Sequence, residues 1–509
     1  MADTRTKNAS RNFAFGLALK AYQIVVPFLI RTAIMYYMGM NYLGLNSFFT
    51  SVLLALNLAE LGVGSAMVYS MYLPIVENDT KMICALLNLY RKYYFAIGAF
   101  IGAVGMALSP VIPHLAKKDV PEDVNILVVY WLNLLATVLS YWMFAYKNSL
   151  LVAHQRNDIS SKVMLVTNTL MYVIQFYVVM GLKSYYVYLI VQICTQVATN
   201  VLTAVIASKK YPDYKPVGKL SKEQMSAING KIRDLFTMKI GMIIVTSADS
   251  LVISAYLGLT VLAVYQNYFM ILTAVMEAIK VLYNSVLSGI GNSIITETPE
   301  KNYKDLKKLS FIAFWMVGFC AAEFLALFQG FMLLWTKSAD NLLGFGMVVA
   351  FVVYFFVDQA NQILITFKDA AGIWHEDRFR PVITAGANLI LNVIMVQFMG
   401  LYGIILSTVV SVVFVGMPWL IHNLFTLLFK RDAREYVWKL FFYAIVITGV
   451  CAVNYAIVRF IPDSGWLWLV ARGAATAVIS NILLAGALYV LEEFAQVKDI
   501  ARRVIKRKV

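Results

Sequence analysis

Long apolar segments alternate with short polar ones from one end of the chain to the other. A helix needs about 20 apolar residues to cross a bilayer, and fourteen windows of the sequence reach that length. They fall at about 13–37, 42–72, 93–113, 123–146, 161–181, 184–207, 236–257, 259–285, 309–335, 341–366, 381–399, 401–425, 438–459 and 465–490. The pattern predicts an all-α polytopic membrane protein with fourteen transmembrane helices, and an even number places both termini on one side.

The composition agrees with this class. Of the 509 residues, 61% are hydrophobic and 14% are charged, whereas a soluble domain has about 25% charged residues. The net charge of +15 is explained by topology, because 33 of the 43 Lys and Arg lie at the termini or in alternate loops and five lie in the opposite loops. The positive-inside rule therefore predicts a plasma-membrane protein with both termini in the cytoplasm and no nucleic-acid partner.

The longest inner loop, 208–235, contains seven of these basic residues, and we expect its charge to lie against anionic membrane lipids. The loop separates two halves of the chain, and helices 1–2 look like helices 7–8 at an offset of 219 residues. Lys20 matches Lys239, and Gly39 matches Gly258. The matches predict duplication of a six-helix unit, and an even-numbered unit repeats in the same orientation.

The predicted architecture is thus two six-helix lobes in parallel repeat, two additional C-terminal helices, and a substrate path between the lobes. Its parts are a cytoplasmic N-terminus (1–12), an N-lobe with helices 1–6 (13–207), a basic cytoplasmic linker (208–235), a C-lobe with helices 7–12 (236–425), helices 13 and 14 (438–490), and a basic cytoplasmic tail (491–509).

Two basic residues, Lys20 and Arg31, interrupt the first apolar window on nearly the same helix face. An ionised side chain at the bilayer centre costs ~2.5–3.5 kcal/mol, so such residues normally face water or a partner. We expect Lys20, Arg31 and their repeat partner Lys239 to line a basic cavity for an anionic substrate. A diphosphate fits best, because guanidinium binds phosphate through paired charge-assisted hydrogen bonds. In the alternative, Lys20 and Arg31 snorkel to opposite headgroup layers.

Acidic residues in the windows are candidates for coupling transport to a proton or a sodium ion. A carboxyl group in the hydrocarbon layer is either neutral or held ionised by a neighbouring base, and both states suit an ion relay. The alternative is a structural ion pair or a helix-packing hydrogen bond. The candidates are Glu60, Asp249, Glu277 and Asp358.

The eighth window adds a lysine and several amides. Lys280 follows Glu277 by three residues and either pairs with it or joins the substrate site. Asn284 lies seven residues past Glu277 on nearly the same face, in a polar tier with Gln266 and Asn267. These amides either bind sugar hydroxyls or hold helices together.

The loops contain no nucleophile motif, glycine-rich phosphate loop or metal-ligand cluster. We therefore expect no enzymatic activity, no cofactor and no metal site. His375 lies in GIWHEDRFRP at 372–381, where pairing between arginine and acidic side chains is expected rather than catalysis.

Two stretches carry a family resemblance: LAELGVGSAMVYSMYLPI at 58–75, and GIWHEDRFRP followed by Asn388 and the Gly400–Gly403 turn. They resemble the Wzx-type polysaccharide flippases of the multidrug/oligosaccharidyl-lipid/polysaccharide (MOP) exporter superfamily, in the version found in Gram-positive capsule and exopolysaccharide clusters. The resemblance covers nearly the whole chain, and it carries Arg31, Lys20 and Lys239 over as positions in the matching helices.

This resemblance implies a MATE-like fold with a V-shaped cavity and alternating access. The implied activity is movement of undecaprenyl-diphosphate-linked oligosaccharide units across the plasma membrane for polysaccharide biosynthesis, with a polysaccharide polymerase and export proteins as candidate partners.

Three other functions stay open. A multidrug exporter of the same superfamily is disfavoured by the basic residues and the two additional helices. A membrane enzyme of polysaccharide assembly would need a long catalytic segment outside the membrane, which the predicted loops lack. A membrane scaffold would use its buried charges for assembly alone.

Overall fold

The computed structural model describes residues 19, 22–23, 25–60, 62–116, 118–462 and 464–498, and for residues 58, 59, 234, 237–239, 242, 245 and 246 it describes the backbone alone. This part of the chain is helical and contains no strand. It forms two compact units, residues 1–263 and 264–509.

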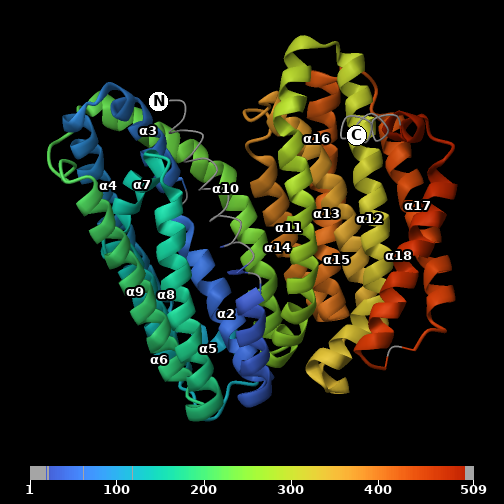
Figure 1. The fold of residues 1–509 in the computed structure, drawn as a ribbon, viewed down its shortest axis with the longest axis horizontal. Helices are drawn as coiled ribbons and strands as arrows, with labels where there is room; N and C mark the ends of the chain where they lie inside the picture. Colours follow the sequence, from blue (N-terminus) through green and yellow to red (C-terminus); the bar gives the residue numbers. More distant parts are fainter. Residues whose placement is uncertain are drawn as a thin grey trace, which may run out of the picture. The chain divides into compact units, whose positions relative to one another are not determined.

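The first unit begins with the helical segment Val25–Tyr37. Its labelled helices (Figure 1) are α2 (Met40–Leu56), α3 (Val63–Glu77), α4 (Thr80–Leu108), α5 (Ile112–Leu115), α6 (Ile126–Trp142), α7 (Asn148–Ala153), α8 (Asn157–Tyr177), α9 (Tyr185–Lys210) and α10 (Lys222–Tyr256). The chain continues through α11 (Leu259–Thr296), which begins in the first unit, into α12 (Pro299–Thr336), α13 (Phe345–Ala371), α14 (Arg380–Met399), α15 (Leu401–Ser411), α16 (Met417–Asn423), α17 (Arg434–Val458) and α18 (Trp466–Leu488).

Nine helices in the described part of the chain are long and apolar enough to cross a membrane, or ten if α6 and the bent segment Ala145–Ala153 form one span. The chain is therefore a multi-pass membrane protein. Each of the fourteen predicted windows contains helix, and the number of fourteen crossings stays a prediction.

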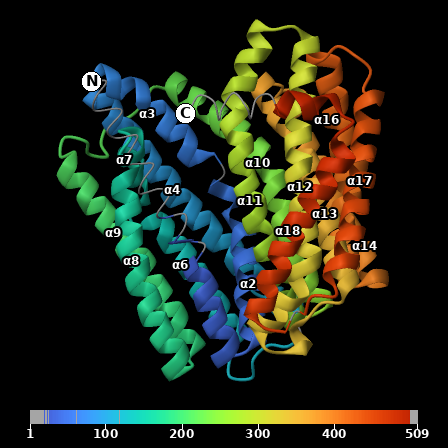
Figure 2. The same cartoon turned by 45° about the vertical axis from the view of Figure 1, so that its right-hand side comes forward.

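In the first unit, α4 packs against α6, and α9 packs against both α6 and α8 (Figures 1 and 2). Helix α10 packs against α2. The start of α11 also approaches α2, because a Cβ atom on Gly44 would lie 1.9 Å from the carbonyl oxygen of Leu259. These contacts divide the chain after residue 263, whereas the sequence pattern places the division in the linker at 208–235.

The linker itself packs on the first unit. The ring of His154 lies 4.2 Å from that of Tyr211 and 5.6 Å from that of Tyr214. Nearby, the side-chain amide of Asn88 donates to the carbonyl oxygen of Gly218 at 2.7 Å. The linker thus packs against other segments of the first unit. Its lysines at 215, 219 and 222 are exposed.

The turns before α2 and α11 each contain a glycine with a positive φ. Gly39 has a φ of 117° and Gly258 a φ of 108°, in the left-handed region that favours glycine. These two glycines are matched by the predicted repeat, so the match in sequence corresponds to a match in local structure.

A loop from elsewhere in the first unit caps the turn at Gly258. The carboxylate of Asp119 accepts a hydrogen bond from the backbone N–H of Thr260 at 3.3 Å, at the start of α11. The ammonium of Lys118 donates to the carbonyl oxygen of Tyr256 at 3.4 Å, at the end of α10. Each charge therefore has the sign that stabilises the helix end it contacts.

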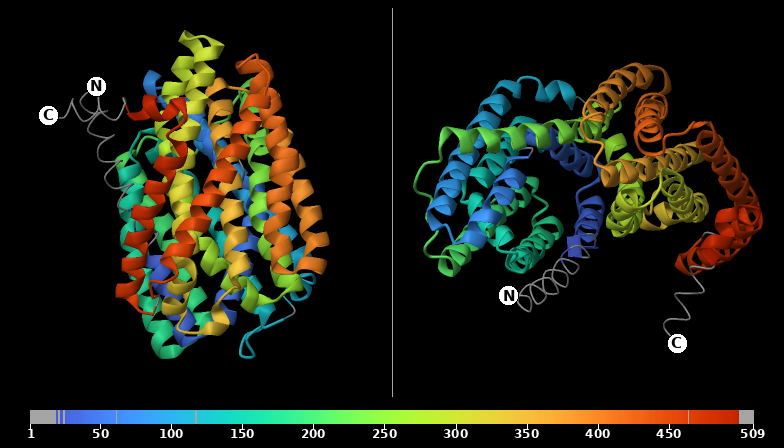
Figure 3. Two further views of the ribbon diagram at one scale, coloured as in Figure 1. Left: turned by 90° about the vertical axis from the view of Figure 1, so that its right-hand side faces the viewer. Right: turned by 90° about the horizontal axis from the view of Figure 1, so that it is seen from above.

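In the second unit, α12 packs against α13, α17 and α18, and α17 packs against α18 (Figures 2 and 3). The rings of Phe314 and Tyr443 stack at 4.6 Å, and the indole N–H of Trp315 donates to Asn481 at 2.9 Å. A Cβ atom on Gly318 would lie 2.9 Å from the side chain of Leu484. The two C-terminal helices are thus packed closely on one helix of this unit.

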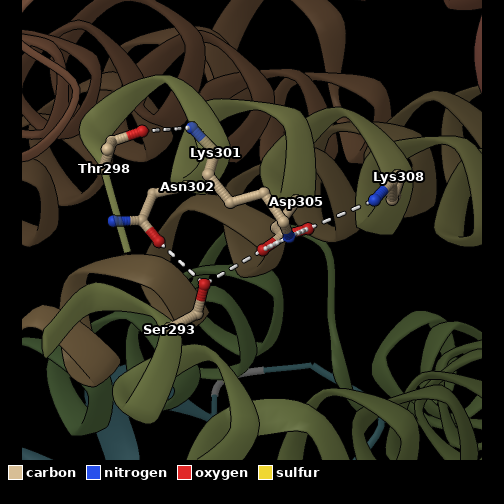
Figure 4. Close-up of polar contacts among 6 residues, drawn as sticks. All are labelled: Ser293, Thr298, Lys301, Asn302, Asp305 and Lys308. Carbon is tan, nitrogen blue, oxygen red and sulfur yellow. Dashed lines mark hydrogen bonds and ion pairs between the residues drawn. The ribbon is translucent and has the colours of Figure 1, made fainter. Parts of the chain in front are cut away.

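Polar contacts join the end of α11 to the start of α12 (Figure 4). Thr298 accepts a hydrogen bond from the backbone N–H of Lys301 at 3.4 Å and caps α12, which begins with Pro299, a residue suited to the first turn. The hydroxyl of Ser293 donates to the carboxylate of Asp305 at 3.1 Å. The Lys301 ammonium binds the same carboxylate at 2.7 Å, which fixes this turn.

Candidate functional site

The predicted basic site is described in part. Lys20 lies outside the described residues, and for Lys239 only the backbone, on α10, is described. Arg31 is partly buried, and its Nη2 donates to the carbonyl oxygen of Ala263 at 3.2 Å. Ala263 lies in the second turn of α11. The contact directs the guanidinium toward the protein, and its role in substrate binding stays a prediction.

The pairing predicted on α11 is confirmed. The Lys280 ammonium lies 3.4 Å from the Glu277 carboxylate, and both side chains are about half exposed. Asn284 is exposed on the same helix, whereas Asn267 is fully buried. The polar tier of the sequence therefore contains one buried amide, Asn267, and one accessible amide, Asn284.

Asp358 of α13 lies close to this pair. Its carboxylate accepts a hydrogen bond from the amide of Gln359 at 3.0 Å, and that side chain in turn accepts one from the hydroxyl of Tyr283 at 3.1 Å. The hydrogen bond from Tyr283 joins α13 to α11, the helix that carries Lys280 and Glu277. Three candidate residues from the sequence thus lie on two neighbouring helices of the second unit: Glu277 and Lys280 on α11, and Asp358 on α13.

Glu60 lies in the first unit, where the second membrane helix is broken. Helix α2 ends at Leu56, a 3-10 turn spans Asn57–Glu60, and α3 begins after Gly62 with its φ of 90°. The Glu60 carboxylate accepts a hydrogen bond from the hydroxyl of Tyr94 at 2.8 Å. The remaining candidate acid, Asp249, is partly buried on α10.

Two buried ion pairs lie at the starts of helices, one at α8 and one at α14. Asp377 binds Arg380 through both carboxylate oxygens, at 2.6 and 2.9 Å, which confirms the pairing predicted in GIWHEDRFRP. Asp158 binds Arg156 in the same way, at 2.8 and 3.2 Å. The two aspartates are 219 residues apart, the offset of the predicted repeat, and both are almost fully buried.

Sequence reasoning missed a buried polar seam between α14 and α15. The amide of Asn388 donates to the Thr408 hydroxyl at 2.8 Å, and the amide of Asn392 donates to Asn388 at 3.3 Å. Ser407 donates to Asn392. The i, i+4 spacing of the two asparagines in an apolar window was the available signal, since amides on one face of a membrane helix form interhelical hydrogen bonds.

Sequence reasoning also missed the tyrosines around Glu60. Tyr90 and Tyr94 share a face of α4 at i, i+4 spacing, but their relation to Glu60 depends on how α4 packs against the broken helix. Among the described residues, no three His, Cys, Asp or Glu side chains are placed to hold a metal ion.

No known protein family matches the chain, and no curated protein is similar to it in sequence. Solved structures are similar to it in fold. Lipid II flippase MurJ in an inward closed conformation matches 94% of this chain and 99% of its own, with a TM-score of 0.69 and 14% identity. A MATE family multidrug resistance transporter of the MOP superfamily, in an inward-facing conformation, matches 78% of this chain and 92% of its own, with a TM-score of 0.61 and 14% identity.

A further MOP superfamily transporter, from Pyrococcus furiosus, matches 82% of this chain and 94% of its own, with a TM-score of 0.50 and 14% identity. The chain therefore has the all-helical fold that lipid II flippase shares with MATE transporters, as the sequence predicted. The assignment to the Wzx-type capsule branch stays a prediction.

Proposed function

We propose that this protein is a flippase for a lipid-linked oligosaccharide. The observation that carries the proposal is the extent of the fold similarity. The lipid II flippase matches 94% of the chain, whereas the MATE family transporter and the Pyrococcus furiosus transporter match 78% and 82%. The longer match is what a flippase with counterparts of α17 and α18 would give, since the sequence predicts these helices as additions to a twelve-helix core.

The substrate in this proposal is an undecaprenyl-diphosphate-linked oligosaccharide for polysaccharide biosynthesis. Arg31, Lys20 and Lys239 bind the diphosphate, because arginine and lysine supply the charge-assisted hydrogen bonds that phosphate oxygens accept. Lys280 and Asn284 bind the glycan. Their support is the accessible polar face of α11, on which both lie.

Carboxylates couple this transport to an ion. The support is that Asp358 and Glu277 lie near one another in the second unit, and that Glu60 occupies a helix break in the first. Asp249 on α10 completes the set. A membrane helix normally keeps an acid only where it faces water or a polar partner.

A second candidate function is ion-coupled export of organic cations. The observations that favour it are the fold similarity to a MATE family transporter and the acidic residues Glu277 and Asp358 on the two helices beside Lys280. This function predicts transport of a cationic dye under an imposed proton or sodium gradient, and no transport of lipid-linked sugars.

The first test is flipping of a fluorescent polyprenyl-diphosphate oligosaccharide by the full chain in proteoliposomes. Wild type should transport it, and Arg31→Gln should transport it about tenfold less or worse, since a hydrogen bond to a charged group contributes ~1.5–3 kcal/mol. Lys304→Gln is the matched control, because this exposed lysine lies near the start of α12, on the side predicted to be cytoplasmic, and the substitution removes the same charge.

If folded Arg31→Gln transports the substrate as well as wild type does, Arg31 does not bind the diphosphate. Absence of transport by folded wild type, across several lipid-linked sugars and both ion gradients, together with export of a cationic dye, would replace the flippase by the second candidate function.

A further inference from the structure

Three neighbouring elements of the first unit carry a row of basic side chains on the side where the linker packs. Helix α4 contributes Arg91, the 3-10 turn Ala145–Lys147 contributes Lys147, and α9 contributes Lys209 near its C-terminal end. The 3-10 turn packs against both α4 and α9, so it joins the two helices. We call these three residues the basic row.

Lys147 holds the centre of the basic row. Its ammonium donates to the hydroxyl of Ser208, which directly precedes Lys209, and this contact ties the 3-10 turn to α9. An ammonium has three donors, so the contact uses one of them. Lys147 is partly buried, whereas Arg91 and Lys209 are exposed. The row thus consists of one positioned cation between two accessible ones.

Exposed apolar residues lie beside the basic row on the two helices. Residues four apart share a helix face, and on each helix an apolar residue is four positions from the basic one. Phe95 follows Arg91 on α4, and Val205 precedes Lys209 on α9. On both helices the basic residue is therefore one turn nearer to the linker than the apolar residue.

The end of α6 continues this pattern between the two helices. The rings of Trp142 and Phe95 stack at 5.1 Å, and the indole N–H of Trp142 donates to the carbonyl oxygen of Phe95 at 3.1 Å. The chain then bends by 45° before Ala145–Ala153, with a φ of 60° at Phe144. We call Phe95, Trp142, Phe144 and Val205 the apolar belt, and its members are 42 to 60% exposed.

The spacing of row and belt matches the layers of a bilayer. Four residues of α-helix rise about 6 Å, and the headgroup region extends about 5–8 Å beyond each face of the hydrocarbon core. When the apolar belt lies in the hydrocarbon, the basic row therefore lies at the level of the lipid phosphates. Basic pockets between membrane helices on the cytoplasmic side bind anionic headgroups, and the linker side is the one predicted to be cytoplasmic.

The charges around the row favour an anionic partner. Two further exposed lysines, Lys92 and Lys210, directly follow two members of the row. Of the acidic residues close to the row in sequence, Asp158 is bound by Arg156 at 2.8 Å, and Asp213 is exposed in the linker. A phosphate group would therefore meet a surface of complementary charge.

We propose that the basic row and the apolar belt form a binding site for an anionic phospholipid of the leaflet on the linker side. The lipid phosphate lies on the row, with Lys147 at its centre, and the acyl chains lie along the belt. A phospholipid uses both features, whereas a free phosphate ion would use the row alone. The site does not depend on the proposed function.

The test is quenching of tryptophan fluorescence by brominated lipids. The purified full chain is reconstituted in vesicles of phosphatidylglycerol and phosphatidylcholine in equal amounts, with bromine on the acyl chains of one lipid or the other. Each protein is measured with and without Trp142→Phe, so that the difference reports on Trp142. In wild type, Trp142 should be quenched more when phosphatidylglycerol carries the bromine, because that lipid is enriched at the site.

Substitutions in the basic row should reduce this preference. Lys147→Gln should lower it about fivefold, the effect of one basic residue near a membrane surface, and Lys147→Arg should keep it because the charge is kept. Arg91→Gln and Lys209→Gln should also lower it. Lys183→Gln is the matched control, because this exposed lysine lies just before the opposite end of α9 and the substitution removes the same charge.

Equal quenching by the two brominated lipids in folded wild type would overturn the proposal. A preference retained by all three glutamine variants of the row would overturn it as well. An equal loss in Lys183→Gln would also do so, because net charge rather than the row would then attract the lipid. If Lys147→Gln does not fold, the two exposed positions of the row still decide the question.

Replacement of chloride by inorganic phosphate at equal ionic strength distinguishes the two sources of phosphate. The preference of wild type should be unchanged, and its loss would overturn the proposal in favour of a site for free phosphate. No lipid-linked sugar is present, so these outcomes are independent of the flipping assay.

Discussion

At the scale of single residues, backbone conformation and charge placement set the structure of the turn between α10 and α11. Gly258 holds a positive φ of 108°, and Asp119 stands directly against it, where a Cβ atom would approach its Oδ2 to 2.7 Å. The same carboxylate caps α11 through Thr260. Any side chain at residue 258 would therefore strain the backbone, and it would also displace the Asp119 carboxylate that caps α11.

Gly258→Ala should lower the free energy of unfolding by about 1–2 kcal/mol for the left-handed backbone conformation, with a further loss from the displaced carboxylate. Thermal unfolding of the purified protein in detergent measures the effect as a lower midpoint temperature. Gly230→Ala is the control, because a Cβ atom there meets nothing within 4 Å and alanine favours the helix by up to ~1 kcal/mol. Equal midpoints for the two variants would contradict this account of the turn.

At the scale of elements, the basic linker is a packed segment of the first unit. Its attachment depends on His154, which stacks on Tyr211 and Tyr214. Burial of the imidazole lowers the pKa of His154 below its ordinary value, against the hydrogen bond to Leu150, and the charge of Lys210 lowers it further. The lowered pKa means that this arrangement favours the neutral imidazole over the protonated one.

Stability should therefore fall on acidification. The folded state has the lower pKa, so the contribution of His154 is present above about pH 6.5, the ordinary value, and is lost as pH falls from there toward the folded-state pKa. The loss is ~1.4 kcal/mol for each unit of pKa difference. Unfolding midpoints measured from pH 7.5 to 5 should decline more steeply for wild type than for His154→Phe, which keeps a ring for stacking. If the unfolding midpoints of the two proteins fall equally with pH, protonation of His154 does not destabilise the protein.

At the scale of the whole molecule, the distribution of basic residues predicts how the chain is inserted. The linker is expected in the cytoplasm, and the turn between α12 and α13 is expected outside. Lys215 and Ala339 are exposed positions in these two segments, so they are suitable for labelling.

In a variant whose four native cysteines are replaced, a membrane-impermeant maleimide should label Ala339→Cys in intact cells. It should label Lys215→Cys after the membrane is made permeable. The physical reason is the strong bias of arginine and lysine toward cytoplasmic loops. The opposite labelling pattern would reverse the predicted orientation of both termini.

The fold class was predictable from sequence, because apolar windows of membrane-spanning length indicate helices that lie in the lipid bilayer. The repeat was visible in Gly39 and Gly258, since a left-handed turn needs glycine wherever it occurs. The pairing of Glu277 with Lys280 and of Asp377 with Arg380 was predictable because three residues bring side chains together on one helical turn or in one short loop.

What tertiary structure alone decided are the contacts between residues far apart in the chain. No local rule places Tyr94 and Tyr141 on the two oxygens of Glu60, or directs Arg31 to the carbonyl of Ala263. The sequence by itself determined that the chain is an all-helical membrane protein, and it predicts which loops are cytoplasmic and which polar residues lie in the membrane-spanning segments. Helix packing decided which of those residues meet, because close approach in a bundle depends on the fit of whole helix faces rather than on spacing along one of them.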